Sequence, residues 1–409
     1  ALLEIRHPRD LEVLEKIYAG SVLLGDDLEE AWGITYAREF DMTNDSHLFA
    51  PRPEWEAKGY RPDEYGRWIG PEGEVALPLY QGVMIGQHDA LRARWISGTG
   101  LKAKWEPIPP EQRTPSPQFL VSQTHVGEPS RSLRVGFRDI ARTTDERTMI
   151  AAVIPGLPCG NKVPLLSTGN ASRCLGLVAV LASYSFDWTN RGRQGSTSIN
   201  YFVIDQAPLP HPTSVSAEAL IRVVASLSMA SHIYAPWWQE LLRGVPEENW
   251  SRARPWRRLW AITPHERLRL RALLDAVVAE LYGLDFDDLA WILRDCDHPA
   301  ALLREKAFCR TLDPKGFWRV DKEKDPELRH TVLSLAAFRD LKATIAAHGG
   351  DREKGIAAFC DAHDGDGWML PETLRLADLG LGHDDRAREP QPVASRLGER
   401  FLPWQLAQS

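Results

Sequence analysis

Hydrophobic and polar positions follow two different patterns along this chain, and the change comes near residue 213. Before that point the apolar runs are short and separated by turns, which is typical of strands and small helices. After it, apolar residues recur at three- and four-residue spacing, which predicts a series of amphipathic helices. The pattern therefore predicts an α+β fold, in which a mixed α/β domain is followed by a mainly helical domain.

Residues 1–79 begin with a predicted helix, whose apolar face is formed by Leu11, Val13, Leu14, Ile17 and Tyr18. Proline and glycine recur between Asp41 and Pro78 and exclude long helices there. We therefore expect an N-terminal helix followed by a turn-rich linking lobe.

Residues 80–212 form the expected mixed domain. Strands are predicted for three short apolar runs, Gln118–Gln123, Leu133–Phe137 and Met149–Ile154. A longer apolar run predicts a buried helix over Ala171–Ser185, and Ser198–Ile204 has the pattern of a further strand. An exit linker is expected at the proline-rich end of the domain, from Pro208 through Pro210 to Pro212.

Residues 213–350 form the expected helical support domain, with helices over Ser216–Ser231, His265–Tyr282, Asp285–Asp295 and Leu328–His348. Thr263 and Pro264 precede the second of them as a favourable N-cap and first-turn pair. The apolar stripe Leu273–Tyr282 is expected to be core rather than interface. Residues 351–409 are rich in Gly and Asp, and we expect them to form an extended tail.

The composition is that of a folded protein of two or three domains, since 43% of the 409 residues are hydrophobic and 26% are charged. Five scattered cysteines without a CxxC pair predict neither a zinc knuckle nor a disulfide framework, and they favour a cytoplasmic location. The longest apolar run, Cys174–Ala182, is too short to span a bilayer, and we expect no signal peptide. The chain begins at Ala1 rather than at a methionine, so we expect it to be part of a longer protein.

Charge is distributed unevenly along the chain. The formal net charge of -7 argues against a polycation that coats nucleic acid. Between Gln81 and Asp205, however, there are 14 Lys and Arg against 9 Asp and Glu. Such a local excess favours a confined surface for a polyanion, and ordinary scatter explains it about equally well.

The chain contains no self-contained catalytic motif. Gly98–Ala103 matches a dinucleotide-binding pattern, but the prolines within Pro107–Pro110 exclude the helix that this pattern requires. Asp45 with Glu56 and Lys58 has the form of a metal-dependent nuclease site, although such triplets arise by chance in an acidic chain. The Asn/Asp-Pro-Pro-aromatic tetrad that amino-methyltransferases use to hold a flipped base is missing.

Two basic segments remain as candidates for contact with a polyanion. Arg138–Thr148 combines three arginines with three threonines, and arginine donors suit phosphate oxygens and guanine edges. The alternative for this segment is an internal ion-pair network with Asp139, Asp145 and Glu146. Arg191–Gly195 is expected to be a flexible basic loop, with a solvated turn as its alternative.

Five separated segments then occur in a recognisable order, namely Arg38–Asp45, Leu77–Gln87, Gly136–Thr148 with Ile154-Pro155, Ser185–Trp188 with Asn200-Tyr201 and Pro208–Pro210, and Leu273–Gly283. In this order they resemble the C-terminal target-recognition region of Eco57I-like bacterial DNA adenine-N6 methyltransferases. Phage-defence methylases of the BREX and DISARM kinds share that region. The resemblance covers Arg38 to Gly283 and is weaker beyond it.

The resemblance implies a DNA target-recognition module of a restriction–modification or phage-defence methyltransferase. The family transfers a methyl group from S-adenosylmethionine to adenine N6, and the residues for that step belong to an upstream domain. We therefore expect no catalytic residue, metal or cofactor in this chain, with S-adenosylmethionine bound by the missing catalytic domain. The implied partners are double-stranded DNA, that catalytic domain and other defence-system subunits.

The expected DNA contacts are the polar and basic residues Gln87, Arg92, Arg94, Lys102, Lys104, Arg142, Arg147, Lys162, Arg191 and Arg193. A surface or salt-bridge role is the alternative for each of them. Two other functions stay open besides DNA recognition. The 15 Trp and the acidic balance also fit a protein-interaction scaffold or a DNA mimic within a defence complex, and the third possibility is the nuclease.

Overall fold

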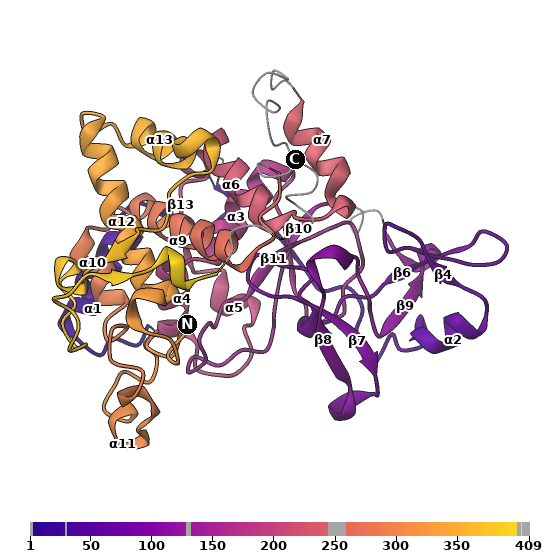
Figure 1. Cartoon of the computed structure of the whole chain (residues 1–409). Helices are drawn as coiled ribbons and strands as arrows, with labels where there is room; N and C mark the ends of the chain where they lie inside the picture. Colours follow the sequence, from indigo (N-terminus) through magenta and orange to yellow (C-terminus); the bar gives the residue numbers. More distant parts are fainter. Residues whose placement is uncertain (1–2, 29–30, 128–131, 244–258, 399–401, 403–409) are drawn as a thin grey trace.

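The computed structural model describes residues 3–28, 31–127, 132–243, 259–398 and 402. It confirms the predicted α+β class, because helices and antiparallel sheets both contribute to the architecture. In Figure 1 a four-stranded sheet occupies the middle of the molecule, between a helical part that contains α9 and α12 and a second sheet beside α2.

The four-stranded sheet has the order β11-β10-β12-β2 and is antiparallel throughout. Its strands are β2 (Thr35–Ala37), β10 (Arg134–Phe137), β11 (Ala151–Ile154) and β12 (Leu165–Ser167). Gly136 on β10 is required by close packing, since a Cβ atom there would lie 2.6 Å from Cγ1 of Ile154. Helix α3 (Ala171–Leu181) packs against β10 and β11 and is buried over most of its length.

The second sheet has the order β3-β9-β6-β5-β4. It comprises β3 (Phe49–Pro51), β4 (Arg61–Pro62), β5 (Trp68–Ile69), β6 (Val75–Pro78) and β9 (Phe119–Ser122), and helix α2 (Arg52–Ala57) packs on β3 and β9. A separate hairpin is formed by β7 (Ala93–Ser97) and β8 (Lys104–Pro107), and it extends from the body of the molecule in Figure 1.

The helical part is built around α9 (Pro264–Leu281) and α12 (His330–Ala347), which pack against each other. Helix α9 begins with the predicted N-cap, because Oγ1 of Thr263 accepts a hydrogen bond from the main-chain N–H of Glu266 at 3.2 Å. Its Leu273–Tyr282 stripe is buried, as expected. Among the described residues, this part also contains α6 (Glu218–Ser228), α7 (Ala235–Leu242), α10 (Phe286–Ile292), α11 (Lys306–Cys309) and α13 (Arg352–Gly365).

Several local predictions are confirmed. The N-terminal helix is α1 (Pro8–Ala19), in which Val13, Leu14 and Ile17 are buried. The three predicted strands of the mixed domain correspond to β9, β10 and β11, and the predicted helices of residues 213–350 correspond to α6, α9, α10 and α12.

Other local predictions are wrong. The single helix expected over Ala171–Ser185 ends at Leu181 and is followed by a separate helix, α4 (Tyr184–Arg193). The strand expected over Ser198–Ile204 is instead the short helix α5 (Tyr201–Ile204). The expected proline linker is the buried strand β13 (Pro208–Pro210), which pairs with β1 (Ser21–Leu23).

The expected extended tail is also wrong for the described part of residues 351–398. It contains α13 and the strand pair β14 (Thr373–Leu374) and β15 (Gln391–Pro392), and Ile356 and Phe359 are buried. One buried cluster runs from Val13 to Val393 through all four predicted segments. Three smaller buried clusters lie outside it, and the division into domains stays a prediction. Among the described residues, no helix is long and apolar enough to cross a membrane.

Candidate nucleic-acid interface

A cleft of about 660 Å³ lies where the mixed part of the chain meets the helical part. It is lined by the turn that precedes β7, the first two turns of α9, the segment before α12 and the C-terminal segment. The lining residues are Gly86, Gln87, Asp89, Arg92, Ile262, Pro264, His265, Arg267, Leu268, Arg271, Asp321, Lys324, Leu328, Arg396 and Leu397. Gln87 and Arg92, two of the predicted DNA contacts, are thus brought together in one site.

Basic residues outnumber acidic ones around this cleft. Arg92, Arg267, Arg271, Lys324 and Arg396 line it, against Asp89 and Asp321. Part of this charge is already paired: Lys324 lies 2.8 Å from Asp321, Arg396 lies 2.6 Å from Glu327, and Asp89 pairs with Arg113.

The remaining cations of the cleft are Arg92, Arg267 and Arg271. Within the described residues none of them forms an ion pair with a carboxylate. Together they leave a local positive charge that an anionic ligand is able to neutralise.

Arg267 and Arg271 lie one turn apart on the same face of α9. The guanidinium of Arg267 is held by main-chain carbonyls, with hydrogen bonds of 2.8 Å to Leu227 and 3.1 Å to His88. Burial lowers the pKa of Arg267 to about 10 and also lowers the pKa of Arg271. Arg267 therefore stays charged at neutral pH, and the partial desolvation of the two guanidinium groups strengthens their attraction for an anion.

Arg271 is the less constrained of the two. Its Nε donates to the main-chain carbonyl of Arg267 at 3.2 Å, and its Nη groups have no hydrogen-bond partner among residues of the described ranges. An arginine with two free Nη donors in a concave site matches the bidentate geometry of phosphate oxygens.

Gln87 has a mainly structural role in the wall of the cleft. Its Nε2 donates to the main-chain carbonyl of Ala182 at 2.6 Å, and its Oε1 accepts from the N–H of Ala151 at 3.3 Å. The side chain therefore joins the end of α3 to the start of β11. This leaves less of its hydrogen-bonding capacity for a base edge than the sequence-based prediction assumed.

Beneath the cleft lies a buried polar cluster centred on Asp275 of α9. Its carboxylate accepts from the N–H of Tyr184 at 2.8 Å, and its Oδ2 lies 2.8 Å from Nε2 of His330 and 3.6 Å from Nη2 of Arg147. Burial opposes ionisation of Asp275, but Arg147 and His330 outweigh it and lower the pKa of this carboxyl below its usual value. The guanidinium of Arg147 also stacks 3.4 Å above the ring of Tyr184.

The side chain of Arg147 is only 11% exposed and pairs with Asp275, which argues against its predicted contact with DNA. The expected ion-pair network with Asp139, Asp145 and Glu146 is not formed by Arg147 either, because its carboxylate partner comes from α9. Of its segment, Arg142 is exposed and remains a surface candidate.

Arg191 and Arg193 are also internal, since their exposed fractions are 1% and 7%. They belong to the last turn of α4, so the expected flexible basic loop is wrong. Arg191 donates to the main-chain carbonyls of Asp145 and Lys315 at 2.9 Å, and Arg193 donates to the hydroxyl of Tyr18. Their guanidinium groups hold segments of the chain together and are not presented to DNA.

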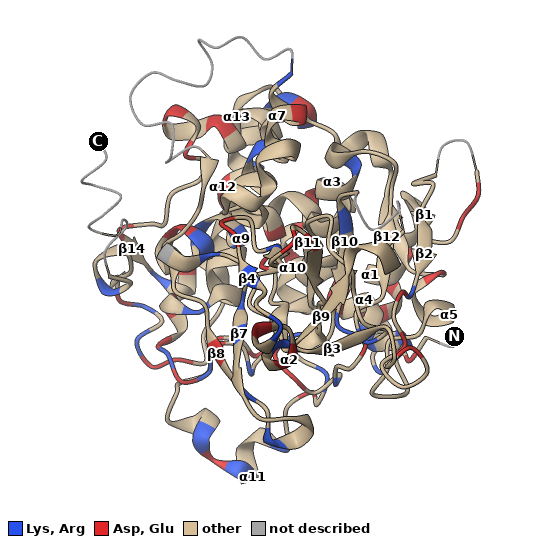
Figure 2. Cartoon of the chain, turned by 90° about the vertical axis from the view of Figure 1, so that its right-hand side faces the viewer, with Lys and Arg blue, Asp and Glu red and all other residues tan. Residues whose placement is uncertain are grey.

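The other predicted contacts lie on the surface. Lys102 and Lys104 are exposed at the end of the β7–β8 hairpin. Arg94, on the same hairpin, donates to Oε1 of Gln112 at 2.9 Å. Lys162 is exposed as well, but its Nζ lies 3.0 Å from Asp139. Figure 2 shows basic positions interspersed with acidic ones along the ribbon on the side that carries β4.

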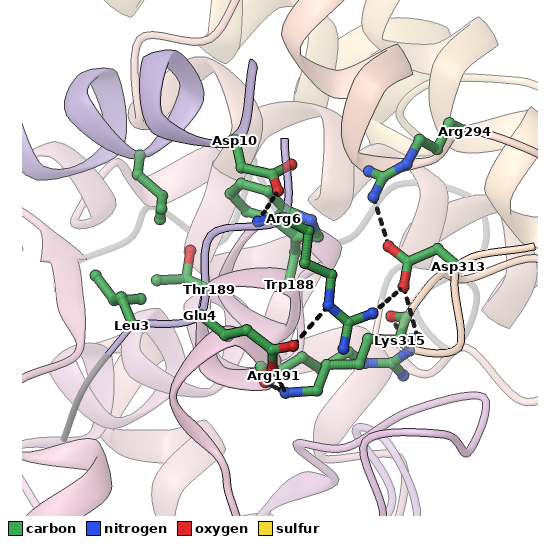
Figure 3. Close-up of a pocket in the computed structure, with 12 residues that line it drawn as sticks. Leu3, Glu4, Arg6, Asp10, Trp188, Thr189, Arg191, Arg294, Asp313 and Lys315 are labelled. Carbon is green, nitrogen blue, oxygen red and sulfur yellow. Dashed lines mark hydrogen bonds and ion pairs between the residues drawn. The ribbon is translucent and has the colours of Figure 1, made fainter. Parts of the chain in front are cut away.

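A second charged hollow, shown in Figure 3, lies where the N-terminal segment crosses α4. In it Glu4 pairs with Arg6 at 2.7 Å and with Lys315 at 2.6 Å, and Asp313 pairs with Arg6 at 2.7 Å. Asp313 also pairs with Arg294, so the charged side chains of this hollow are joined in an ion-pair network.

Arg267 and Arg271 are not among the residues predicted from the sequence, because the apolar stripe of α9 indicates a core helix. A signal was present, since the spacing of four places both arginines on one helical face. The cations Lys324 and Arg396 carried no such signal, because only the folded chain brings them to the cleft.

The alternative functions gain little from the structure. Each described Trp side chain is buried or half-buried, and none is among the exposed large hydrophobic residues of the described parts. The side chains of the nuclease triplet have separate local partners: Asp45 accepts from the N–H of Asp41 at 2.8 Å, Glu56 lies 3.4 Å from Arg52, and Lys58 lies over the ring of Trp55.

No model of a known protein family matches this chain, and a search of curated proteins finds no match either.

Proposed function

We propose that this chain binds double-stranded DNA, with the cleft between β7 and α9 holding the backbone of one strand. The observation that carries the proposal is the group Arg92, Arg267 and Arg271, which has no carboxylate partner within the described ranges. Phosphate contacts supply most of the affinity of DNA-binding proteins, and arginine is well suited to make them.

The size and the position of the cleft support contact with one strand rather than enclosure of a duplex. The cleft has a volume of about 660 Å³, which is typical of pockets for small ligands. This volume is far too small to enclose a DNA duplex. Arg92 directly precedes β7, so the β7–β8 hairpin starts at the edge of the cleft. Its exposed Lys102 and Lys104 would provide a second set of contacts along the same backbone.

The proposed biological role follows the resemblance to target-recognition regions of DNA adenine-N6 methyltransferases. In that role this chain holds the site in register, and a separate catalytic domain, with S-adenosylmethionine, methylates the adenine. The partners would be that domain and other subunits of a restriction–modification or phage-defence system.

The test is to titrate a labelled duplex with the whole chain at several salt concentrations and to measure binding by fluorescence anisotropy. We expect affinity to fall steeply with salt, and the double variant Arg92→Gln/Arg271→Gln to bind about tenfold more weakly or worse, with a smaller salt slope. Arg375→Gln is the matched control, since Arg375 is an exposed arginine paired with Asp378 away from the cleft.

Absence of binding at low salt, or a double variant that binds like the wild type, would contradict the proposal. A DNA mimic would instead bind no duplex and would compete with DNA for a DNA-binding protein.

A further inference from the structure

A compact group of potential metal ligands lies in the helical part, outside the cleft lining. It consists of Asp295, His298 and His383, and one ligand atom from each residue lies within 4.8 Å of the others. Asp295 and His298 follow helix α10, whereas His383 lies in the C-terminal segment after the turn Leu376–Leu379. The fold therefore brings together two imidazoles and a carboxylate from two distant parts of the sequence.

His383 is oriented by a buried carboxylate. Nδ1 of His383 lies 2.8 Å from Oδ1 of Asp297, and the main-chain N–H of His383 donates to Oδ2 of Asp297 at 2.8 Å. Asp297 is fully buried, and the contact engages Nδ1 and leaves Nε2 for another ligand. Metal-binding histidines in proteins commonly have this arrangement, in which a carboxylate holds the nitrogen that faces away from the metal.

His298 and Asp295 form the other half of the group. Nε2 of His298 lies 3.2 Å from Oδ1 of Asp295, and the rings of His298 and His383 have their centroids 4.1 Å apart. Asp295 has a left-handed backbone with φ of 65°, a conformation that costs free energy for a residue other than glycine. The chain therefore holds this carboxylate beside the imidazole at a local cost.

We propose that Asp295, His298 and His383 bind a divalent transition-metal ion such as Zn²⁺, with Asp297 as the positioning residue of His383. Imidazole and carboxylate ligands suit zinc and its neighbours in the first transition row. Ligand atoms around a tetrahedral zinc ion are about 3.3 Å apart, given bonds of about 2.0 to 2.2 Å, so small side-chain rotations would close the site. This inference is independent of DNA binding.

The bound ion would cross-link two segments of the chain that are far apart in sequence. It would join the loop after α10 to the C-terminal segment, which also carries Arg396 at the rim of the cleft. Three protein ligands leave one coordination position for water, which is typical of zinc sites that are not purely structural.

The experiment uses the full chain, freed of metal with a chelator that is then removed by dialysis. We expect calorimetric titration with Zn²⁺ to give about one equivalent bound, and Zn²⁺ to raise Tm by a few degrees because it binds only the folded chain. Co²⁺ should give the visible absorption of a bound ion, whereas Mg²⁺, which prefers oxygen ligands, should do neither.

Three variants test the site, and they replace one ligand, the positioning residue and a control histidine. His383→Ala removes a half-exposed side chain and should abolish both the stoichiometric binding and the cobalt spectrum. Asp297→Asn should weaken binding about tenfold or more, because it disturbs the orientation of His383. His47→Ala is the control, since His47 is an exposed histidine elsewhere on the chain.

Two results would overturn the proposal. One is failure of the metal-free chain to bind Zn²⁺ at micromolar concentration. The other is loss of binding in His47→Ala equal to that in His383→Ala, which would indicate nonspecific coordination. Circular dichroism of each variant separates loss of a ligand from loss of the fold.

Discussion

The cleft and the N-terminal hollow are both lined by charged side chains, yet they differ in how those charges are used. In the hollow, the carboxylates of Glu4 and Asp313 each pair with two cations, so Arg6, Arg294 and Lys315 all have a carboxylate partner there (Figure 3). In the cleft, Arg267 and Arg271 lie on α9 without a carboxylate partner in the described parts of the chain. An arginine count along the sequence therefore does not identify a binding surface, because the pairing of each guanidinium decides whether it is free for a ligand.

We expect the largest loss of stability on substitution of Arg191, which is one of the buried arginines with a carboxylate partner. Arg191→Ala would remove the buried donor to several main-chain carbonyls and the ion-pair partner of Asp187, whose carboxylate would keep only the main-chain N–H donors of Thr148 and Met149. We expect a loss of about 3 to 5 kcal/mol in the free energy of unfolding, measured by urea denaturation.

If Arg191→Ala lowers the free energy of unfolding by less than about 1 kcal/mol and also weakens DNA binding, the structural role of Arg191 is contradicted. That result would show that Arg191 serves a ligand rather than the fold.

A smaller effect is expected at Glu4 in the N-terminal hollow. Hydrogen bonds from Arg6 and Lys315 lower the pKa of Glu4 to about 2, from 4.5 in an unstructured chain. The folded state therefore binds this proton less readily, so the stabilisation is complete above pH 4.5 and is lost as the pH falls from about 4.5 towards 2. Because the side chain is partly exposed, Glu4→Gln should cost only about 1 kcal/mol at pH 7.

The measurement is the difference in unfolding free energy between wild type and Glu4→Gln as a function of pH. The difference should shrink as the pH is lowered below 4.5. A difference that stays constant down to pH 3 would mean that the ion pairs of Glu4 contribute nothing in solution.

The smallest effect on stability is expected at Arg271 in the cleft. Its charge is desolvated and has no carboxylate partner in the described chain, so Arg271→Met should change the unfolding free energy by less than about 0.5 kcal/mol or raise it slightly. Thermal and urea denaturation of this variant provide the measurement. A loss of about 2 kcal/mol or more in the free energy of unfolding would show that Arg271 stabilises the fold. The cleft and the N-terminal hollow would then no longer differ in how their charges are used.

Much of the secondary structure was predictable from periodicity. Helices α9 and α12 carry long runs of helical spacing, and Thr263 with Glu266 marks the start of α9 through its capping box. Short apolar runs were ambiguous, as at Tyr201–Ile204, because four residues do not distinguish a strand from one turn of helix. The prolines of β13 suggested a linker, whereas pairing with β1 and burial make them an edge strand.

The candidate site was less predictable than the fold. Gln87 and Arg92 line the cleft, whereas Arg191 and Arg193 are buried and Arg147 pairs with a buried carboxylate. The sequence could not separate these groups, since an arginine near an acidic residue in sequence often pairs with a different residue in space. Arg147, for example, lies near Asp145 in the chain but pairs with Asp275 of α9.

The sequence by itself determined the α+β class, the positions of the main helices and strands and the local excess of basic residues before residue 205. These properties depend on neighbours within a few turns of the chain, and hydrophobic spacing and capping record such neighbours directly. Only the tertiary structure decided which arginines are neutralised, where the cleft lies and that Asp295, His298 and His383 meet. The physical reason is that electrostatic pairing and ligand geometry act over a few ångströms in space, and the residues concerned come from segments far apart in sequence.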